Sequence, residues 1–221
     1  PEAEYGGSVV CYLSMNNSDG LLDKLSRLLA DNSIGLDLLA ARPRGNRLSP
    51  EIRESIEALL DSLDEKHTDM GASGSDEDRA STLIYGNGCF AVRRYETAVE
   101  TYRKLLDADP SDTTAAFNLG LSCLRLRRLQ DALNVFTDLI QTDPAMAEAC
   151  YQRGNVYDDL DNGDRALTDY SRAIALKPDY LQAYYNRGLV LARLRRHEEA
   201  IAEFDQAIAL QPSLSNAHLN L

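Results

Sequence analysis

The sequence lacks the features that mark membrane, secreted and metal-binding proteins. Its 221 residues contain no apolar run of about 18 residues, so no membrane span is predicted, and no basic start followed by a short apolar stretch indicates a signal peptide. Its four cysteines form no Cys-x-x-Cys pair, and its three histidines show no metal-ligand spacing. We therefore expect no membrane contact and no metal or cofactor site.

Positive charge is also scarce. The chain has 23 Lys and Arg against 35 Asp and Glu, a net charge of −12, which argues against a nucleic acid partner because phosphates repel an acidic protein. Most of this excess lies in residues 1–78, where 16 acidic residues stand against 7 basic ones. Because the chain begins at Pro1 and stops at Leu221 within a predicted helix, we expect it to be a fragment of a longer protein.

What the sequence does contain is a repeat of 34 residues. A glycine, an alanine, an aromatic residue and a proline recur in the same order. Apolar residues before and after each glycine have helical spacing, so each repeat is predicted to be a helical hairpin. The recurring residues are the glycines Gly86, Gly120, Gly154 and Gly188, the alanines Ala98, Ala132, Ala166 and Ala200, the aromatics Tyr102, Phe136, Tyr170 and Phe204, and the prolines Pro110, Pro144, Pro178 and Pro212.

Each recurring residue has an expected place in the hairpin. A glycine within a helix costs about 1 kcal/mol relative to alanine, so we expect it to allow close contact with the alanine of the second helix, as between Gly86 and Ala98. The aromatic residue should fill the space between hairpins. Because proline disfavours helix in the residue before it, the second helices should end at Asp109, Asp143, Lys177 and Gln211.

The pattern resembles the tetratricopeptide repeat family, which has helix–turn–helix units of this length and residue order. The family's large aromatic residue four positions before the glycine is replaced by Thr82, Ala116 and Cys150 and appears only as Tyr184. The resemblance implies an all-α, right-handed superhelical solenoid, with Gly86-Asn87-Gly88 inside a helix rather than in a turn. The units are residues 79–112, 113–146, 147–180 and 181–214, with residues 215–221 as the start of a fifth, so that the array spans 79–221.

Three cysteines fall within this register. Cys89 and Cys123 stand three residues after their glycines on the inward face, and Cys150 takes a missing-aromatic position. A nucleophilic thiol would need an exposed, electropositive site, so we expect these three to be small, buried and reduced core residues. Free buried thiols suit a reducing, cytoplasmic compartment.

Residues 1–66 are expected to form an acidic helical region ahead of the repeats. Residues 67–78 are nearly free of apolar side chains and are expected to be a flexible linker. Ser8 to Leu13 has the pattern of a short strand.

Two amphipathic helices are expected within residues 1–66. They either cap the apolar end of the array, which we favour, or form a separate docking or self-association element. One apolar stripe is Leu21, Leu22, Leu25, Leu28 and Leu29, and the second is Ile52, Ile56, Leu59, Leu60 and Leu63, which follows Ser49 as N-cap and Pro50 as first helical residue.

One face of the first helices is rich in amides and aromatic rings. Because a helix turns about 100° per residue, the residue two before each glycine points away from the partner helix. That position holds Ile84, Asn118, Gln152, Asn186 and Asn220, the position after the glycine holds Asn87, Leu121, Asn155 and Leu189, and the position three before it holds Leu83, Phe117, Tyr151 and Tyr185.

In the family this face forms a concave groove whose asparagines hold the main chain of an extended peptide. We expect the amides to face solvent in the free protein and each to pair with both an N–H and a C=O group of a peptide. Amides at these positions are also common in the family without a specific ligand. The resemblance implies a peptide-binding groove of Asn87, Phe117, Asn118, Tyr151, Gln152, Asn155, Tyr185, Asn186 and Asn220.

Two other binding modes are less well supported. The family's clamp for a C-terminal carboxylate needs lysine where Leu83 stands and basic residues where Glu148 and Gln152 stand, so we exclude it. Arginines cluster at the turns, interrupted by Asp159 and Asp161, and we interpret them as solvated charges rather than a site for RNA or an acidic partner. These arginines are Arg93, Arg94, Arg125, Arg127, Arg128, Arg193, Arg195 and Arg196.

The sequence as a whole favours a protein-binding scaffold or adaptor that is not an enzyme. No nucleophile, base and orienting group are visible together. The alternative is a regulatory or targeting module of a larger enzyme whose catalytic part lies outside this chain.

Overall fold

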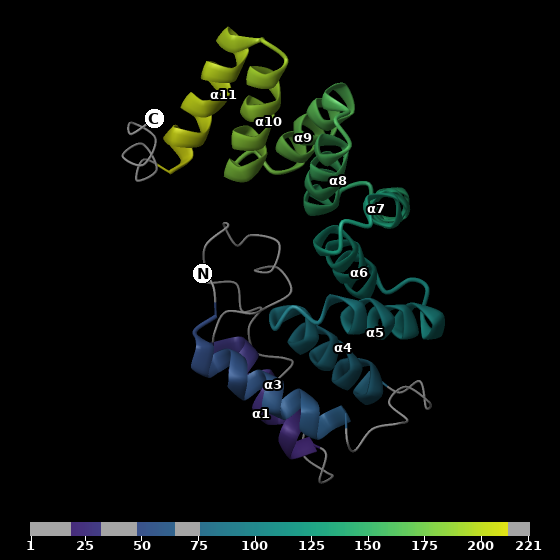
Figure 1. The fold of residues 1–221 in the computed structure, drawn as a ribbon. Coiled ribbons are helices and arrows are strands. Elements are labelled where there is room, and N and C mark those ends of the chain that lie inside the picture. Colours follow the sequence, from purple (N-terminus) through teal and green to yellow (C-terminus); the bar gives the residue numbers. More distant parts are fainter. Residues whose placement is uncertain (1–18, 32–47, 65–75, 212–221) are drawn as a thin grey trace, which may run out of the picture. The chain divides into compact units, whose positions relative to one another are not determined.

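Helices make up the regular structure of the chain. The computed structural model describes residues 19–31, 48–64 and 76–211, and within them it contains ten helices and no strand (Figure 1). The predicted all-α repeat solenoid is therefore confirmed, whereas the strand at 8–13, Cys11, residues 67–75 of the linker and the start of the fifth unit lie outside the described residues. The helices are α1 (Asp19–Asp31), α3 (Pro50–Asp64), α4 (Asp76–Ala91), α5 (Tyr95–Ala108), α6 (Thr113–Arg125), α7 (Leu129–Thr142), α8 (Ala147–Asp159), α9 (Gly163–Leu176), α10 (Leu181–Arg193) and α11 (His197–Leu210).

The helices α4 to α11 follow the 34-residue register in pairs. As expected, the residue before each proline is the C-cap of a second helix, with non-helical backbone at Asp109, Asp143, Lys177 and Gln211. Gly86 to Gly88 lie within α4, also as expected. Helix α4 begins three residues before the predicted start, so residues 76–78 are helical rather than linker.

The chain divides into two compact units, residues 1–126 and 127–221. In the first unit α1 and α3 pack on each other and on α4, and α5 packs on both α4 and α6. In the second unit each helix from α7 to α11 packs on the next one along the chain. Within each unit, consecutive helices thus bury their facing surfaces against one another, as expected for stacked repeats. The handedness of the superhelix stays a prediction.

At three of the four repeat glycines the nearest neighbour is an aromatic ring rather than the expected alanine. A Cβ atom at Gly154 would lie 2.7 Å from Cε1 of Tyr170, and one at Gly188 would lie 2.7 Å from Cε1 of Phe204. At Gly86 the nearest ring is that of Tyr102, 2.8 Å away. The ring lies one helical turn beyond the alanine and is long enough to reach across to the first helix. It therefore packs on the glycine of its own hairpin, and the filling of space between hairpins stays a prediction.

The N-terminal helices are fixed to α4 by an apolar contact. Leu25 and Leu60 are fully buried, and a Cβ atom at Gly88 would lie 3.2 Å from each of them. Gly88 therefore allows α1 and α3 to approach α4 closely. The N-cap expected for α3 is confirmed, since Ser49 Oγ accepts a hydrogen bond from the Ile52 amide. The buried residues of the two predicted stripes are Leu22, Leu25, Leu29, Ile56, Leu60 and Leu63.

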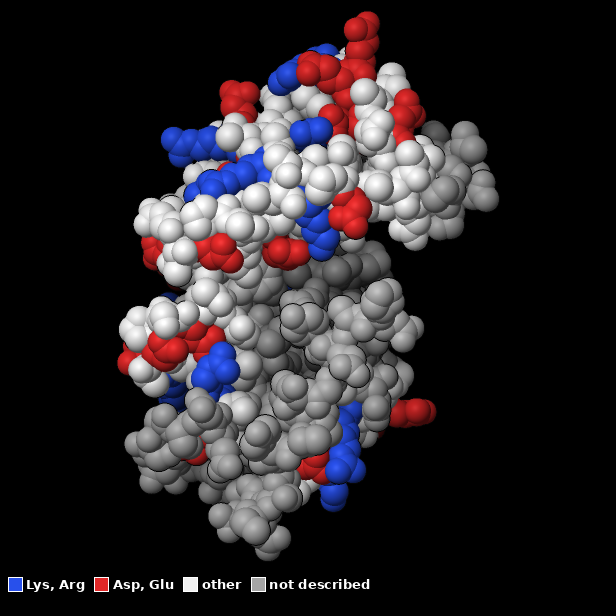
Figure 2. Space-filling view, turned by 180° about the vertical axis from the view of Figure 1, so that it is seen from behind, with Lys and Arg blue, Asp and Glu red and all other residues white. Residues whose placement is uncertain are grey.

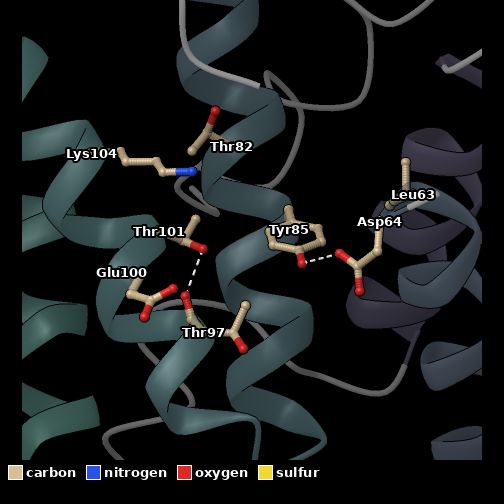
Figure 3. Close-up of a pocket in the computed structure, with 8 residues that line it drawn as sticks. All are labelled: Leu63, Asp64, Thr82, Tyr85, Thr97, Glu100, Thr101 and Lys104. Carbon is tan, nitrogen blue, oxygen red and sulfur yellow. Dashed lines mark hydrogen bonds between the residues drawn. The ribbon is translucent and has the colours of Figure 1, made fainter. Parts of the chain in front are cut away.

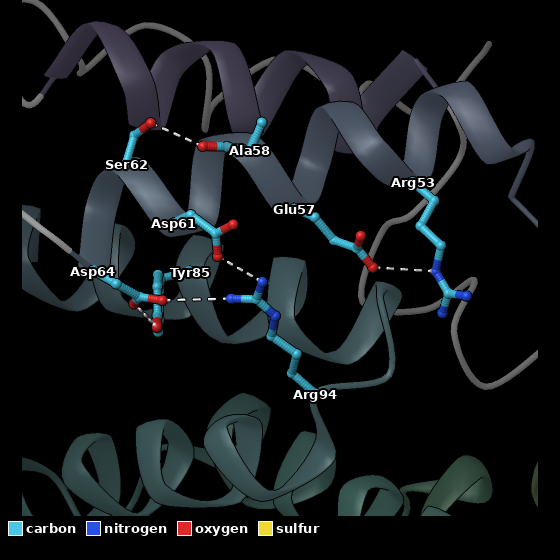
Figure 4. A network of polar contacts seen from close by, with 8 residues as sticks. All are labelled: Arg53, Glu57, Ala58, Asp61, Ser62, Asp64, Tyr85 and Arg94. Atoms are coloured by element: carbon cyan, nitrogen blue, oxygen red, sulfur yellow. Dashed lines mark hydrogen bonds and ion pairs between the residues drawn. The ribbon is translucent and has the colours of Figure 1, made fainter.

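Charged side chains add a second set of contacts along the same junction (Figure 4). Arg94 pairs with Asp61 at 2.6 Å and with Asp64 at 3.4 Å, and Tyr85 donates a hydrogen bond to Asp64. Arg53 donates to the carbonyl of Val92 at 2.9 Å. These contacts join α3 to α4 and to the turn that follows it.

The cysteines behave as expected from the register. Cys89, Cys123 and Cys150 are free thiols with no exposed surface. Burial raises the pKa of Cys89 to about 12 and also raises that of Cys150. Both thiols are thus kept protonated at neutral pH, which is the opposite of an activated nucleophile.

Candidate functional site

The proposed binding residues are less accessible than the sequence suggests. Asn118 is 1% exposed and Gln152 is 5% exposed, so the expectation that these amides face solvent is wrong. Asn155, Tyr185 and Asn186 are half-buried, and Asn220 lies outside the described residues. The side chains are buried because they bond to one another across consecutive first helices. We call the face that they form on α4 and α6, and separately on α8 and α10, the amide face.

In the first unit three side chains form a hydrogen-bonded chain. The Tyr102 hydroxyl donates to Oδ1 of Asn87 at 2.8 Å, and Nδ2 of Asn118 donates to the same oxygen at 3.1 Å. The chain joins α5, α4 and α6. Oδ1 of Asn118 is buried and has no hydrogen-bond partner. We call such a tyrosine–asparagine–asparagine chain a relay.

The second unit contains a second relay of the same form. Tyr170 donates to Oδ1 of Asn155 at 2.8 Å, and Nδ2 of Asn186 donates to that oxygen at 2.9 Å. Nδ2 of Asn186 also lies 3.0 Å from the Tyr151 hydroxyl, and Nδ2 of Asn155 donates to Oε1 of Gln152 at 3.0 Å. The structure thus brings four of the proposed site residues together within this unit and brings Asn87 and Asn118 together in the first.

The relays follow a sequence signal that the repeat pattern alone did not disclose. In the first and third repeats a tyrosine at the aromatic position occurs together with an asparagine after the glycine, as Tyr102 with Asn87 and Tyr170 with Asn155. The second and fourth repeats carry phenylalanine and leucine at the same two positions. A hydroxyl therefore occurs only where an acceptor is present. Pairing the two positions would have predicted both relays.

The tyrosine hydroxyls keep their protons. Burial raises the pKa of Tyr102 and of Tyr170 well above the usual value. Each hydroxyl is therefore available as a hydrogen-bond donor throughout the neutral pH range.

Two ion pairs lie within the hairpins of the second unit, and sequence reasoning missed them. Arg153 makes two hydrogen bonds to Asp169, of 2.7 and 2.8 Å, and Arg187 pairs with Glu203 at 2.7 Å. Hydrogen bonding to Asp169 raises the pKa of Arg153. In each case an arginine just before the glycine meets an acid just before the aromatic residue. The shared 16-residue spacing was the available signal, and the pairs connect the two helices of one hairpin.

Four of the eight arginines at the turns are paired with nearby acids, and Arg94 is one of them. Arg127 pairs with Asp159 at 2.7 Å, Arg193 pairs with Asp158, and Arg196 pairs with Glu199 at 2.7 Å. Figure 2 shows acidic and basic side chains interspersed on one face of the molecule. This arrangement supports solvated turn charges rather than a continuous basic surface for a phosphate backbone.

A small hollow lies between α3, α4 and α5 in the first unit (Figure 3). Its volume is about 220 Å³, which is below the roughly 300–1,000 Å³ typical of sites for small molecules. Much of its polar lining is bonded internally, as Tyr85 is to Asp64 and Thr101 Oγ1 is to the Thr97 carbonyl. We assign no ligand to it. The lining residues are Leu63, Asp64, Thr82, Tyr85, Thr97, Glu100, Thr101 and Lys104.

Two further features are absent from the ranges that the structure describes. No group of three or more His, Cys, Asp or Glu side chains is arranged to hold a metal ion in residues 19–31, 48–64 and 76–211. Over the same part of the chain, no helix has the length and apolar character needed to cross a bilayer.

Solved structures share this fold over most of the chain. The structure of the MamA RS-1 ArsTM double mutant aligns with a TM-score of 0.66 and 21% identity, over 92% of this chain and 99% of that one. MamA 41-end from Desulfovibrio magneticus RS-1 gives 0.66 and 21%, over 90% and 98%. YrrB, described as a TPR protein with an unusual peptide-binding site, gives 0.58 and 20%, over 90% and 100%. Identities this low show a common fold.

The sequence itself matches a family model. The model described as "Tetratricopeptide repeat" covers residues 90–147 and 151–215, which is more than half of the chain. Comparison with curated proteins found no match. The family model agrees with the 34-residue register, the helical hairpins and the fold of the solved structures. The chain therefore belongs to the tetratricopeptide repeat family.

Proposed function

We propose that this chain is a non-catalytic scaffold that binds an extended peptide, or an extended segment of a partner protein, on its amide face. One observation carries the proposal: three successive repeats have an amide next to an aromatic ring at the same two positions of the first helix. These pairs are Phe117 with Asn118, Tyr151 with Gln152, and Tyr185 with Asn186. Amides hydrogen-bond to a peptide main chain, and rings supply contact area for its side chains.

The chemistry of the described residues supports a binding role over a catalytic one. The thiols are buried and their pKa values are raised, as at Cys89 and Cys150. The buried carboxylate of Asp169 is already paired with Arg153. Neither group has the accessibility that a nucleophile or a general base requires. The unusual peptide-binding site described for YrrB, which shares the fold, is in keeping with this proposal.

We propose that α1 and α3 cap the first repeat rather than serve as a separate docking or self-association element. Their apolar side chains, among them Leu25 and Leu60, are buried and contact Gly88 of α4. An apolar stripe already covered within its own chain leaves little surface for a second copy. We accordingly place partner binding on the amide face.

A charge placed on the amide face tests the proposal. Leu189 stands one residue after the repeat glycine and is 46% exposed, so Leu189→Glu should disturb the face with little effect on folding. Leu176 on α9 is 40% exposed and provides the matched control, Leu176→Glu. The measurement is binding of a random dodecapeptide library to the full chain. We expect Leu189→Glu to lower the number of retained peptides at least about tenfold, against little change for the control. Equal retention by both variants would contradict the location of the site.

A further inference from the structure

We infer that the Asn162–Gly163 pair, in the turn between α8 and α9, is a site of spontaneous deamidation at which the chain changes its own charge and backbone without an enzyme. Asparagine followed by glycine is especially prone to this reaction, because glycine has no side chain to shield its backbone nitrogen. The chain contains two such pairs, Asn87–Gly88 and Asn162–Gly163. The structure places them in opposite environments, and this contrast selects the second pair.

The reaction needs only the chain and one water molecule. The backbone nitrogen of Gly163 attacks Cγ of Asn162, so that an N–C bond forms and the Cγ–Nδ2 bond breaks. Ammonia leaves and carries the proton that the glycine nitrogen has lost. Water then opens the cyclic imide. Cleavage of its N–Cγ bond gives aspartate, whereas cleavage of its bond to the main-chain carbonyl carbon gives isoaspartate, whose backbone is longer by one methylene group.

The first pair is protected by the helix around it. Asn87 and Gly88 lie within α4, and Asn87 is 8% exposed. Oδ1 of Asn87 accepts hydrogen bonds from Tyr102 at 2.8 Å and from Asn118 at 3.1 Å. Because α4 continues on both sides of Gly88, the amide of this glycine belongs to the hydrogen-bond ladder of the helix. Both reacting groups are therefore held in place unless α4 opens locally.

The second pair stands at the start of a helix. Asn162 is the N-cap of α9 and Gly163 is its first residue, where backbone N–H groups have no acceptor within the helix. The hydrogen bond from the Arg165 amide to Oδ1 of Asn162 is 3.4 Å long, beyond the usual range of roughly 2.7–3.2 Å. Attack requires a change in ψ of Asn162 from 73°, which also breaks the 3.0 Å bond from the Ala166 amide to the Asn162 carbonyl. Fraying of the first turn of α9 is thus sufficient, and helix ends fray at low cost.

The two products should affect the turn differently. Aspartate keeps an oxygen at the N-cap, and the helix dipole favours its negative charge. Isoaspartate lengthens the main chain where Gly163 packs closely on α10. A Cβ atom at Gly163 would lie 3.3 Å from Cδ1 of Leu194 and 3.4 Å from Cγ1 of Val190. The added methylene group should therefore disturb the contact between the third and fourth repeats.

Incubation of the full chain at mildly alkaline pH, followed by tryptic peptide mapping, tests the inference. The two pairs fall in the tryptic peptides 80–93 and 154–165, and fragment ions separate Asn162 from Asn155. We expect Asn162 to deamidate at least about tenfold faster than Asn87, because reaction at Asn87 must await opening of α4. Incubation in urea is the control, since both pairs should react at similar rates in the unfolded chain.

Equal rates at the two pairs of the folded chain would overturn the inference, as would faster reaction at Asn87. An Asn162 that reacts in urea but stays intact in the folded chain would also overturn it. Asn162→Gln gives a second check, because a longer side chain would have to close a less favourable six-membered ring. This variant should stay unmodified at residue 162, and deamidation there at the parent rate would contradict the mechanism.

The effect on the turn has its own measurement. Anion exchange separates the deamidated chain by its extra negative charge, and electron-transfer fragmentation identifies the fraction that carries isoaspartate. We expect this fraction to unfold at a lower urea concentration than the parent, whereas the matched variant Asn162→Asp should unfold at the parent midpoint. An isoaspartate fraction as stable as the parent would overturn the expected disturbance of the turn.

Discussion

At the residue scale, the four hairpin turns place side chains where the backbone favours glycine. Arg93, Arg127, Asp161 and Arg195 have φ angles of 71°, 59°, 57° and 63°. A residue with a Cβ atom in this left-handed region costs roughly 1–2 kcal/mol, and arginine has no short polar group to offset that cost. The equal spacing of the four residues shows that the strain comes from the hairpin geometry and is repeated in each unit.

Replacing Arg195 by glycine should stabilise the protein. Relief of the left-handed strain outweighs the greater freedom of glycine in the unfolded chain, so we expect Arg195→Gly to raise the free energy of unfolding by about 0.5–1 kcal/mol. Urea unfolding followed by circular dichroism measures the change. Arg195→Ala is the control, because it removes the same charge and keeps the Cβ atom. An equal gain from both variants would show that the charge, not the backbone, is responsible.

At the element scale, one glycine outside the repeat register determines how the N-terminal helices meet the array. The other repeats carry Ser122, Val156 and Val190 at the position of Gly88. Helix α4 therefore lacks the side chain that the equivalent helices have at this position. Leu25 and Leu60 occupy the space, each 3.2 Å from where a Cβ atom of residue 88 would be. The cap and the first repeat are thus adapted to each other.

A double-mutant cycle tests that adaptation. Gly88→Val introduces the residue found in the third and fourth repeats, and overpacking against Leu60 should cost about 1–3 kcal/mol of unfolding free energy. In a Leu60→Ala background the new side chain has room, so the cost of Gly88→Val should be smaller by at least about 0.5 kcal/mol. Urea unfolding of the four chains gives the coupling. Additive effects would mean that α3 does not pack on Gly88.

At the scale of the whole molecule, the buried thiols and phenols link stability to alkaline pH. Burial raises the pKa of Cys89 to about 12, and the pKa values of Cys150, Tyr102 and Tyr170 are also raised. In the unfolded chain a thiol loses its proton near pH 8.5 and a phenol near pH 10. The stability due to these groups is therefore fully present below pH 8.5. It is lost as pH rises toward the folded pKa values.

We predict that the free energy of unfolding is nearly constant from pH 7 to 8 and falls above pH 9. Each group that stays protonated only in the folded state adds a slope of up to about 1.4 kcal/mol per pH unit. Urea titrations at half-unit steps to pH 11 measure this slope. Cys89→Ala should reduce the slope between pH 9 and 10, where the phenols of the unfolded chain are still mostly protonated. An unchanged slope would show that Cys89 ionises alike in both states.

The sequence alone determined the parts of the fold that depend on local spacing. The 34-residue period predicted α4 to α11, and the prolines predicted the C-caps at Asp109, Asp143, Lys177 and Gln211. Register also predicted the burial of Cys89, Cys123 and Cys150. These features follow from the periodicity of one helix and the backbone limits of proline, which involve neighbouring residues only.

Tertiary structure decided which side chains meet in the hairpins and at the proposed site. Gly86, Gly154 and Gly188 lie closest to aromatic rings rather than to alanines, and the amides bond to one another instead of facing solvent, as Asn118 does with Asn87. These partners are 15 to 31 residues apart in the relays. Their contact depends on how closely two helices approach and on which way each amide turns. A single helix's periodicity places a side chain on a face, but only the neighbouring helix determines whether that face meets water, a ring or another amide.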